Sequence, residues 1–533
     1  MSKSSRKNKK TSLKEKRKED SKGKKKKNNF NIPQTSLSPH QEEVNKLIGF
    51  YQTGQLSQAE KLAVLITQRF PEHQLSWKIL GALLRQTGRF AESVKANRRS
   101  AQLNPRDPEA QFNLGNSLKM LGELEAAAEC FRQALTLKQN YIQAYNNLGN
   151  TLREQGKTVE AEKNFLIAIS LDPAYADGHY NLGFLYQKRE KLDEAEREYR
   201  KAIALRGDFP EAHNNLGNVL IEQNRLEEAK ESLSHAIALR SDFREALMSR
   251  WQILFDQGKF EDALRDADLC DTSQSRACSL ETLYVLGRNE EIYRRLSKWA
   301  ELDDQNIRMA AFASFISSLN RKETAHNFCS NPLEFLYFSN VSFHIENFQV
   351  FLRKLIEDLS AIDTVWQPPK KSTVNGSQTK NDINLFETQS KSIKLLESVI
   401  LEELNNYHHK YNDRTCSFIS KWPSEKLLRG WHVILKQNGY QESHIHVDGW
   451  LSGVVYLQVV PPKSSGEGAI EFSLNGVNYP EPATSGLRHQ PNLGDIVFFP
   501  SSLHHRTIPF TTEADRIIVS FDLVPQSQIN SLQ

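Results

Sequence analysis

The chain has 533 residues, of which 25% are charged and 38% are apolar, and its formal net charge is +4. This length predicts two or three domains. It contains no run of about 18 apolar residues, so we expect no membrane-spanning helix. No apolar stretch follows the basic N-terminus, so we do not expect a secretory signal. The five cysteines are scattered without a CxxC pair, as is typical of reduced thiols, so we expect a cytoplasmic protein.

The N-terminal segment is strongly basic. Residues 1–30 hold 14 Lys and Arg side chains against three acids, a net charge of +11, so the rest of the chain carries −7. Because this segment has almost no apolar residues, we expect residues 1–38 to form a disordered Lys-rich tail. Such an arm can make nonspecific contact with nucleic acid or an anionic surface. A solvated arm without a specific partner is the open alternative, because charge runs are weak signals.

A 34-residue repeat fills the first half of the chain. Leu-Gly pairs recur at this spacing, with glycines at Gly81, Gly115, Gly149, Gly183 and Gly217. Alanines follow the last four glycines in phase, with a bulky residue such as Phe131 or Phe165 between them. Small and large residues in this order are typical of tetratricopeptide repeats, which stack as helical pairs around a concave surface. We expect an all-α solenoid of about seven repeats over residues 39–275, capped by degenerate helical repeats over residues 276–334.

Asparagines also recur at the 34-residue spacing, two residues before the glycines: Asn113, Asn147, Asn181 and Asn215. Each amide can donate and accept hydrogen bonds, so a ladder of them could hold the backbone of an extended peptide. Here the chain resembles the repeat domain of O-linked N-acetylglucosamine transferases, which implies a protein or peptide partner in the groove. A local capping or packing role for these asparagines is the equally weighted alternative.

The pattern changes to short β-type runs over residues 335–533. Strands are predicted at 431–435, 451–460, 469–472, 495–499 and 516–523, separated by polar turns. Several short strands separated by polar turns predict a sandwich or jelly roll. Amphipathic helices at 348–362 and 392–407 are expected to cover one sheet, and the polar segment 367–382 is expected to be an exposed loop.

Within this β region, a histidine-rich motif points to metal chemistry. His446 and Asp448 stand two residues apart, and residues at that spacing on a strand share one face. His505 follows Asp448 by 57 residues, and Arg516 follows His505 by 11. Two histidines and one carboxylate leave open positions on a metal and are the ligand set of non-heme Fe(II) oxygenases.

Residues 429–523 resemble the Fe(II)/2-oxoglutarate-dependent dioxygenases of the prolyl-hydroxylase-like group. The resemblance rests on five motifs in family order, which are 446–448, 451–457 (LSGVVYL), 468–470, 499–509 (FPSSLHHRTIP) and 516–521 (RIIVSF). It implies a double-stranded β-helix, or jelly roll, with a helical lead-in. It also implies Fe(II) and 2-oxoglutarate as cofactors, with O₂ as cosubstrate.

The resemblance further implies roles for individual residues. His446, Asp448 and His505 would bind iron, and Arg516 would grip the distal carboxylate of 2-oxoglutarate with Tyr456 and Ser520 beside it. Two alternatives stay open. His444 could replace Asp448, which we disfavour because a carboxylate suits a hard Fe(II) site better. His504 could replace His505, but the family pattern selects His505.

The sequence therefore predicts a tetratricopeptide solenoid that recruits a substrate or partner for a dioxygenase domain. That domain would hydroxylate a peptide or protein side chain, with a prolyl residue as the guess by analogy, although analogy of fold does not fix the substrate. The alternative is a non-catalytic interaction scaffold carrying a vestigial oxygenase fold.

Overall fold

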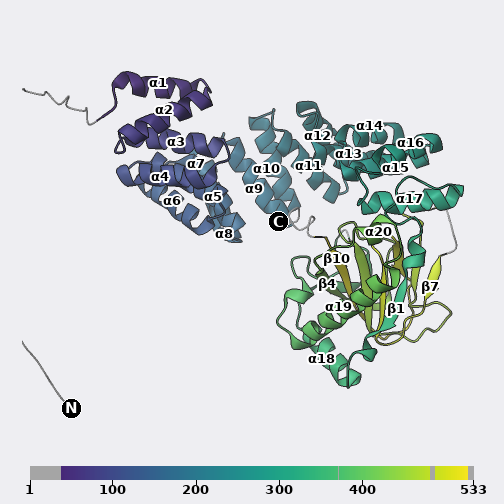
Figure 1. The fold of residues 1–533 in the computed structure, drawn as a ribbon. Coiled ribbons are helices and arrows are strands. Elements are labelled where there is room, and N and C mark those ends of the chain that lie inside the picture. Colours follow the sequence, from purple (N-terminus) through teal and green to yellow (C-terminus); the bar gives the residue numbers. More distant parts are fainter. Residues whose placement is uncertain (1–37, 370, 481–485, 526–533) are drawn as a thin grey trace, which may run out of the picture. The chain divides into compact units, whose positions relative to one another are not determined.

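The computed structural model describes residues 38–369, 371–480 and 486–525, and the predicted Lys-rich tail lies outside these ranges except for Ser38. The chain divides into two compact units, Met1–Pro173 and Ala174–Gln533. Figure 1 labels the main elements of both. The boundary between the units falls inside the repeat array. Within the described residues, no helix is both long and apolar enough to cross a membrane.

The first unit is a stack of four helix pairs. Each pair corresponds to one 34-residue repeat, with neighbouring helices joined by short turns. The helices are α1 (Gln41–Gln52), α2 (Leu56–Arg69), α3 (Gln74–Gln86), α4 (Phe90–Leu103), α5 (Pro108–Met120), α6 (Leu124–Leu137), α7 (Ile142–Glu154) and α8 (Thr158–Leu171).

The repeating glycines allow the two helices of a pair to approach closely. A Cβ added at Gly149 on α7 would lie 2.6 Å from the Phe165 ring of α8, and one added at Gly115 would lie 2.8 Å from the Phe131 ring. Both phenylalanines are fully buried. The small and large residues of the predicted pattern therefore face each other where the two helices of a pair make contact.

Adding one methyl group at this contact tests how tightly the repeats are packed. We expect Gly149→Ala to destabilise the first unit by about 1–3 kcal/mol, because the buried Phe165 ring has no free space to move into. Thermal unfolding of the full chain measures the effect. Gly49→Ala is the matched control, since a Cβ there meets nothing within 4 Å in helix α1 and alanine favours a helix over glycine. Equal midpoints for the two variants would contradict the close-packing argument.

The second unit begins with the rest of the solenoid. With α1–α8, the helices through α14 form seven described pairs. Three further helices follow, where degenerate repeats were predicted. The helices are α9 (Ala176–Lys188), α10 (Leu192–Leu205), α11 (Pro210–Glu222), α12 (Leu226–Leu239), α13 (Arg244–Asp256), α14 (Phe260–Cys270), α15 (Ser273–Val285), α16 (Asn289–Trp299) and α17 (Ile307–Asn320).

The β region of the second unit contains two antiparallel sheets, as predicted for a jelly roll. The larger has the order β1-β8-β5-β10-β4-β3-β2 and the smaller β7-β6-β9. The strands are β1 (Tyr337–Asn340), β2 (Thr364–Trp366), β3 (Thr373–Thr379), β4 (Leu427–Gln441), β5 (Leu451–Gln458), β6 (Ile470–Ser473), β7 (Leu487–His489), β8 (Asp495–Pro500), β9 (His504–Thr507) and β10 (Arg516–Val524). The helices of this region are α18 (Phe348–Ser360), α19 (Lys391–Tyr411) and α20 (Ser417–Ser420).

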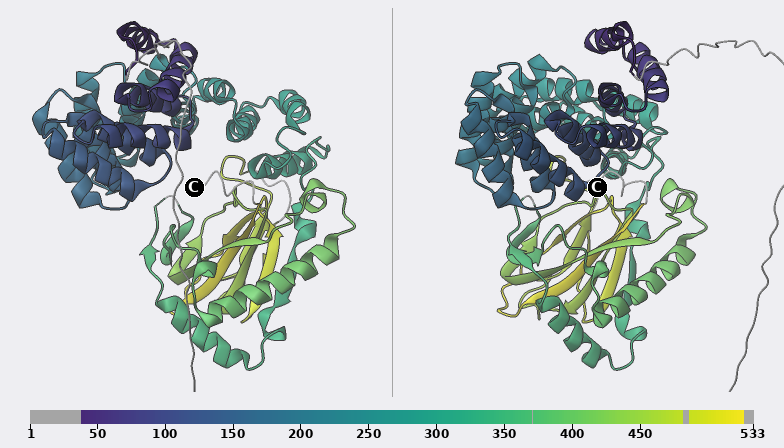
Figure 2. Two further views of the ribbon diagram at one scale, coloured as in Figure 1. Left: turned by 60° about the vertical axis from the view of Figure 1, so that its left-hand side comes forward. Right: turned by 90° about the vertical axis from the view of Figure 1, so that its left-hand side faces the viewer.

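Both faces of the large sheet are covered. Val455 and Leu457 of β5 pack with α18 and α19 on one face. Figure 2 shows the green helices beside the sheet from two sides. Val454 and Tyr456, which point the other way, join a second core with Phe472 of the small sheet. Burial on both faces explains why β5 reads as a continuous apolar run rather than an alternating one.

One prediction about the β region was wrong. Residues 367–382, expected to form an exposed loop, contain strand β3, which pairs with β4. The strand is polar in composition, yet Thr373, Gln378 and Thr379 are buried. Pairing with a long neighbouring strand, rather than intrinsic propensity, makes this segment extended.

Candidate metal centre

Three histidines meet at one point of the jelly roll. His444 and His446 lie just after β4, and His505 lies on β9 of the small sheet. One possible ligand atom from each lies within 4.8 Å of the others. The backbones of His444 and His505 exchange two hydrogen bonds, at 3.2 and 3.1 Å, which tie the segment after β4 to the small sheet.

The second ring nitrogen of each histidine is occupied. Nδ1 of His446 donates to Asp522 Oδ1 at 2.6 Å, and Nδ1 of His444 donates to the Glu442 carbonyl at 2.6 Å. Nδ1 of His505 donates to the Leu503 carbonyl at 3.3 Å. Because these acceptors fix the proton on Nδ1, the lone pair of each ring lies on Nε2, which is how metal-binding histidines are usually oriented. The Ser372 hydroxyl lies 3.5 Å from Nε2 of His444.

Burial keeps the His444 and His505 rings neutral. The pKa of His444 is lowered to about 4, first by burial and then by the neighbouring His446. The pKa of His505 lies well below its usual value for the same reasons, with His444 and His446 both contributing. Neutral imidazole is the form that binds a metal, so the cluster is prepared for an ion at neutral pH.

The structure differs from the favoured ligand set at Asp448. Its side chain is exposed and lies outside the histidine cluster. The prediction assumed that the strand continues through this residue, but β4 ends at Gln441 and residues 447–448 form a turn closed by a hydrogen bond from Gly449 N to His446 O. The alternation that places every second residue on one face does not extend to Asp448, and His444 occupies the cluster in its place.

The two adjacent histidines of β9 point in opposite directions. His505 joins the cluster, as expected from the motif, whereas His504 faces away and its Nε2 lies 2.8 Å from the Tyr479 hydroxyl. Alternation along the strand separates the two side chains.

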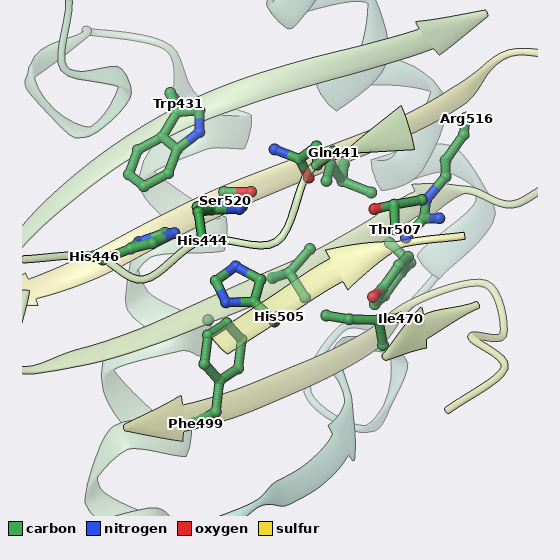
Figure 3. Close-up of a pocket in the computed structure, with 14 residues that line it drawn as sticks. Trp431, Gln441, His444, His446, Ile470, Phe499, His505, Thr507, Arg516 and Ser520 are labelled. Atoms are coloured by element: carbon green, nitrogen blue, oxygen red, sulfur yellow. The ribbon is translucent and has the colours of Figure 1, made fainter. Parts of the chain in front are cut away.

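The histidines line one end of a small cavity between the two sheets. Arg516, Tyr456 and Ser520, the residues predicted to hold 2-oxoglutarate, line the same cavity. Figure 3 shows Arg516 away from the histidine rings, beside Thr507. The cavity thus brings together the predicted cofactor residues and the histidine cluster.

The Arg516 guanidinium is almost fully buried, yet no carboxylate of the described residues pairs with it. Nη1 donates to the Gly468 carbonyl at 2.7 Å, while Nε finds no hydrogen-bond partner there. The guanidinium carbon lies 5.1 Å from the centre of the Tyr456 ring, and the Tyr456 hydroxyl is also unpartnered among these residues. Because burying an unpaired charge is costly, this arrangement suits an anionic ligand.

The electrostatics of the cavity favour donation toward such a ligand. Burial raises the pKa of Tyr456 to about 12, so the phenol keeps its proton. A neutral hydroxyl and a planar cation at one end of the cavity match a carboxylate, which accepts from both.

Several residues of the site were not predicted. Asp522, which orients His446 and accepts from Ser452 Oγ at 2.7 Å, stands two residues after Ser520 on β10. Because residues two apart on a strand share a face, the predicted role of Ser520 could have pointed to Asp522 as well. Trp431 and Gln441 line both the cavity and a wider cleft that opens beside His444 and His446 and includes Asp448 and Lys371. No sequence signal links these residues to the histidines.

The repeating asparagines make contacts between consecutive repeats. In the first unit, Asn147 donates to Asn116 Oδ1 at 2.7 Å. In the second unit, Asn215 donates to the Tyr180 hydroxyl at 3.2 Å. Asn113 and Asn181 are half-buried on their helices. Some of the amide donors thus stabilise the stack, and the peptide-binding role of these four residues stays a prediction.

Comparisons with known proteins agree with both parts of the chain. Residues 429–522 match the family model described as "Putative 2OG-Fe(II) oxygenase". Models of the tetratricopeptide repeat match residues 48–108, 115–156, 149–190, 186–223 and 210–243. No curated protein matches the chain.

Several solved structures are similar to part of the chain. PilF of Pseudomonas aeruginosa is 19% identical with a TM-score of 0.34, over 36% of this chain and 88% of that one. MamA of Desulfovibrio magneticus RS-1 is 22% identical with a TM-score of 0.29, over 32% and 96%. By the family models, the chain joins tetratricopeptide repeats to a domain whose sequence matches the model of putative 2OG-Fe(II) oxygenases.

Proposed function

We propose that the C-terminal domain is an Fe(II)- and 2-oxoglutarate-dependent dioxygenase that hydroxylates a peptide or protein side chain recruited by the repeats. The observation that carries this proposal is one cavity with a three-histidine cluster together with a buried arginine that has no carboxylate partner among the described residues. A metal-binding cluster alone fits several chemistries. The added site for a carboxylate favours a metal that works with a dicarboxylic 2-oxo acid.

His444, His446 and His505 are the proposed iron ligands. Imidazole nitrogens suit iron among other transition metals, and Nε2 is the nitrogen that carries the lone pair when Nδ1 of each ring donates. In this proposal Asp448 contacts solvent or substrate at the rim of the open cleft, whereas the sequence alone favoured it as the third ligand. Asp522 accepts from Nδ1 of His446 and so fixes the orientation of its ring.

Other residues of the cavity would bind 2-oxoglutarate and exclude water. Arg516 holds the distal carboxylate of 2-oxoglutarate with its planar fork, and the Tyr456 and Ser520 hydroxyls donate to the same group. When bound, Fe(II) and 2-oxoglutarate supply oxidative decarboxylation with O₂ to succinate and CO₂, coupled to hydroxylation of a C–H bond. The surrounding apolar side chains, Ile470, Phe499 and Ile518, keep bulk water out of the cavity.

The repeats would supply the substrate. A concave helical surface binds extended polypeptides, and Asn113, Asn147, Asn181 and Asn215 remain the proposed contacts. Docking at the repeats raises the local concentration of a side chain at the metal, so a weak local interaction in the open cleft suffices for turnover.

The choice of the third ligand is testable in the full chain. We expect His444→Ala to weaken Fe(II) binding by more than about tenfold, and Asp448→Ala to leave it within about twofold of the native value, because only His444 points into the cluster. Anaerobic titration with Fe(II) in the presence of 2-oxoglutarate measures both, and succinate release on adding O₂ reports function. If Asp448→Ala weakens Fe(II) binding and His444→Ala does not, the iron ligands are His446, Asp448 and His505 instead. Failure of the native chain to bind iron with 2-oxoglutarate would favour a non-catalytic scaffold.

A further inference from the structure

The last helices of the solenoid pack directly on a loop of the oxygenase domain. This loop follows β6 and carries Tyr479, which is buried. Its ring lies 5.4 Å from that of Phe312 and 4.7 Å from that of Phe315, both on α17. These side chains belong to one core that also includes strands of both sheets. The end of the solenoid and the jelly roll therefore share a hydrophobic core.

A buried ion pair anchors the same loop. Arg308 of α17 donates to both carboxylate oxygens of Glu281 on α15, at 2.6 and 2.8 Å. The Asn478 side-chain amide donates to Glu281 Oε2 at 2.6 Å. Glu281 is only 2% exposed, so its charge is satisfied by these two groups together. Charge-assisted bonds of this kind fix geometry as well as contribute energy, and they hold the residue next to Tyr479.

Tyr479 in turn contacts the strand that carries His505. Its hydroxyl lies 2.8 Å from Nε2 of His504, whose other ring nitrogen is buried without a partner among the described residues. His504 and His505 are neighbours on β9, a strand of only four residues. A side chain fixed on one face of so short a strand limits the movement of the residue on the other.

We propose that Tyr479 is a positioning residue for the metal ligand His505, and that helices α15 and α17 hold it in place. The proposal rests on the proposed function of the histidine cluster and adds that the end of the repeat stack is part of the support of the metal site. The hydrogen bond between Tyr479 and His504 transmits this support to β9. Loss of that bond loosens the strand and widens the distribution of His505 positions.

Removing the hydroxyl while keeping the ring separates positioning from packing. We expect Tyr479→Phe to weaken Co(II) binding by about tenfold, the lower end of what loss of a supporting partner costs a metal site. Amide hydrogen exchange at residues 504–507 of the metal-free chain is expected to become faster. Asn478→Ala, which frees the loop from Glu281, is expected to change both readouts in the same direction.

Tyr293→Phe is the matched control. The Tyr293 hydroxyl donates to the carbonyls of Ile316 and Lys322 near the end of α17, so this variant removes a comparable bond that does not reach β9. Equal cobalt affinity and equal exchange in the Tyr479 and Tyr293 variants would overturn the inference. If the native chain binds no cobalt, the proposed function fails, and unchanged exchange at residues 504–507 would still refute the support of β9 by Tyr479.

Discussion

Replacing His505 by alanine is expected to abolish metal binding at the histidine cluster. His505 is the ligand contributed by the small sheet, whereas His444 and His446 come from one short segment after β4. Two histidines so close in sequence leave one side of the ion without protein ligands. Loss of an outer partner weakens a metal site by about 10- to 100-fold, so loss of a ligand is expected to cost more than about 100-fold.

Titration of the anaerobic full chain with Co(II) or Fe(II) measures this loss, and succinate release with 2-oxoglutarate and O₂ should disappear with it. His409→Ala is the control, because His409 is exposed on α19 and outside the cluster. The unfolding temperature of each variant shows that the chain remains folded. Metal affinity in His505→Ala equal to that of the control would rule out the histidine cluster as the metal centre.

The sequence predicts those parts of the molecule that depend on local periodicity. The 34-residue spacing identifies the helix pairs, because each glycine must face a bulky residue of the paired helix, as Gly149 faces Phe165. Five apolar runs give strands β4, β5, β6, β8 and β10 to within a few residues, except that β4 is much longer at both ends. The spacing of apolar residues predicts these elements because every second residue of a strand, or every third to fourth residue of a helix, is buried.

The parts that escape prediction depend on where a regular element ends or on contacts between distant segments. Asp448 was expected on a strand face, but the backbone turns after His446 and carries it to the surface. Residues 373–379 form a strand only because β4 offers a partner. Tyr479 and Glu281 are almost 200 residues apart in sequence, and no local pattern indicates that they support the same strand.

Replacing Arg516 by glutamine is expected to separate cofactor binding from stability. Glutamine keeps a polar amide on the side chain, but it carries no charge for a carboxylate. Losing one partner of a buried charged pair costs about 2–5 kcal/mol, which corresponds to a loss of roughly 30-fold to several thousand-fold in 2-oxoglutarate affinity. Metal affinity in the absence of 2-oxoglutarate should stay near the native value, because Arg516 lies outside the histidine cluster.

The stability of the ligand-free Arg516→Gln chain should not fall, although its affinity for 2-oxoglutarate does. Arg516 is buried without a carboxylate partner among the described residues, so removing its charge relieves a desolvation cost in the ligand-free chain. We expect an unfolding temperature equal to or above the native value, together with loss of the stabilisation that 2-oxoglutarate gives the native chain. Arg506→Gln is the control, since Arg506 is half-exposed on the outer face of β9 and pairs with Glu471. Retention of 2-oxoglutarate binding in Arg516→Gln would show that another group holds the carboxylate, whereas a large drop in stability would mean that Arg516 is a structural residue.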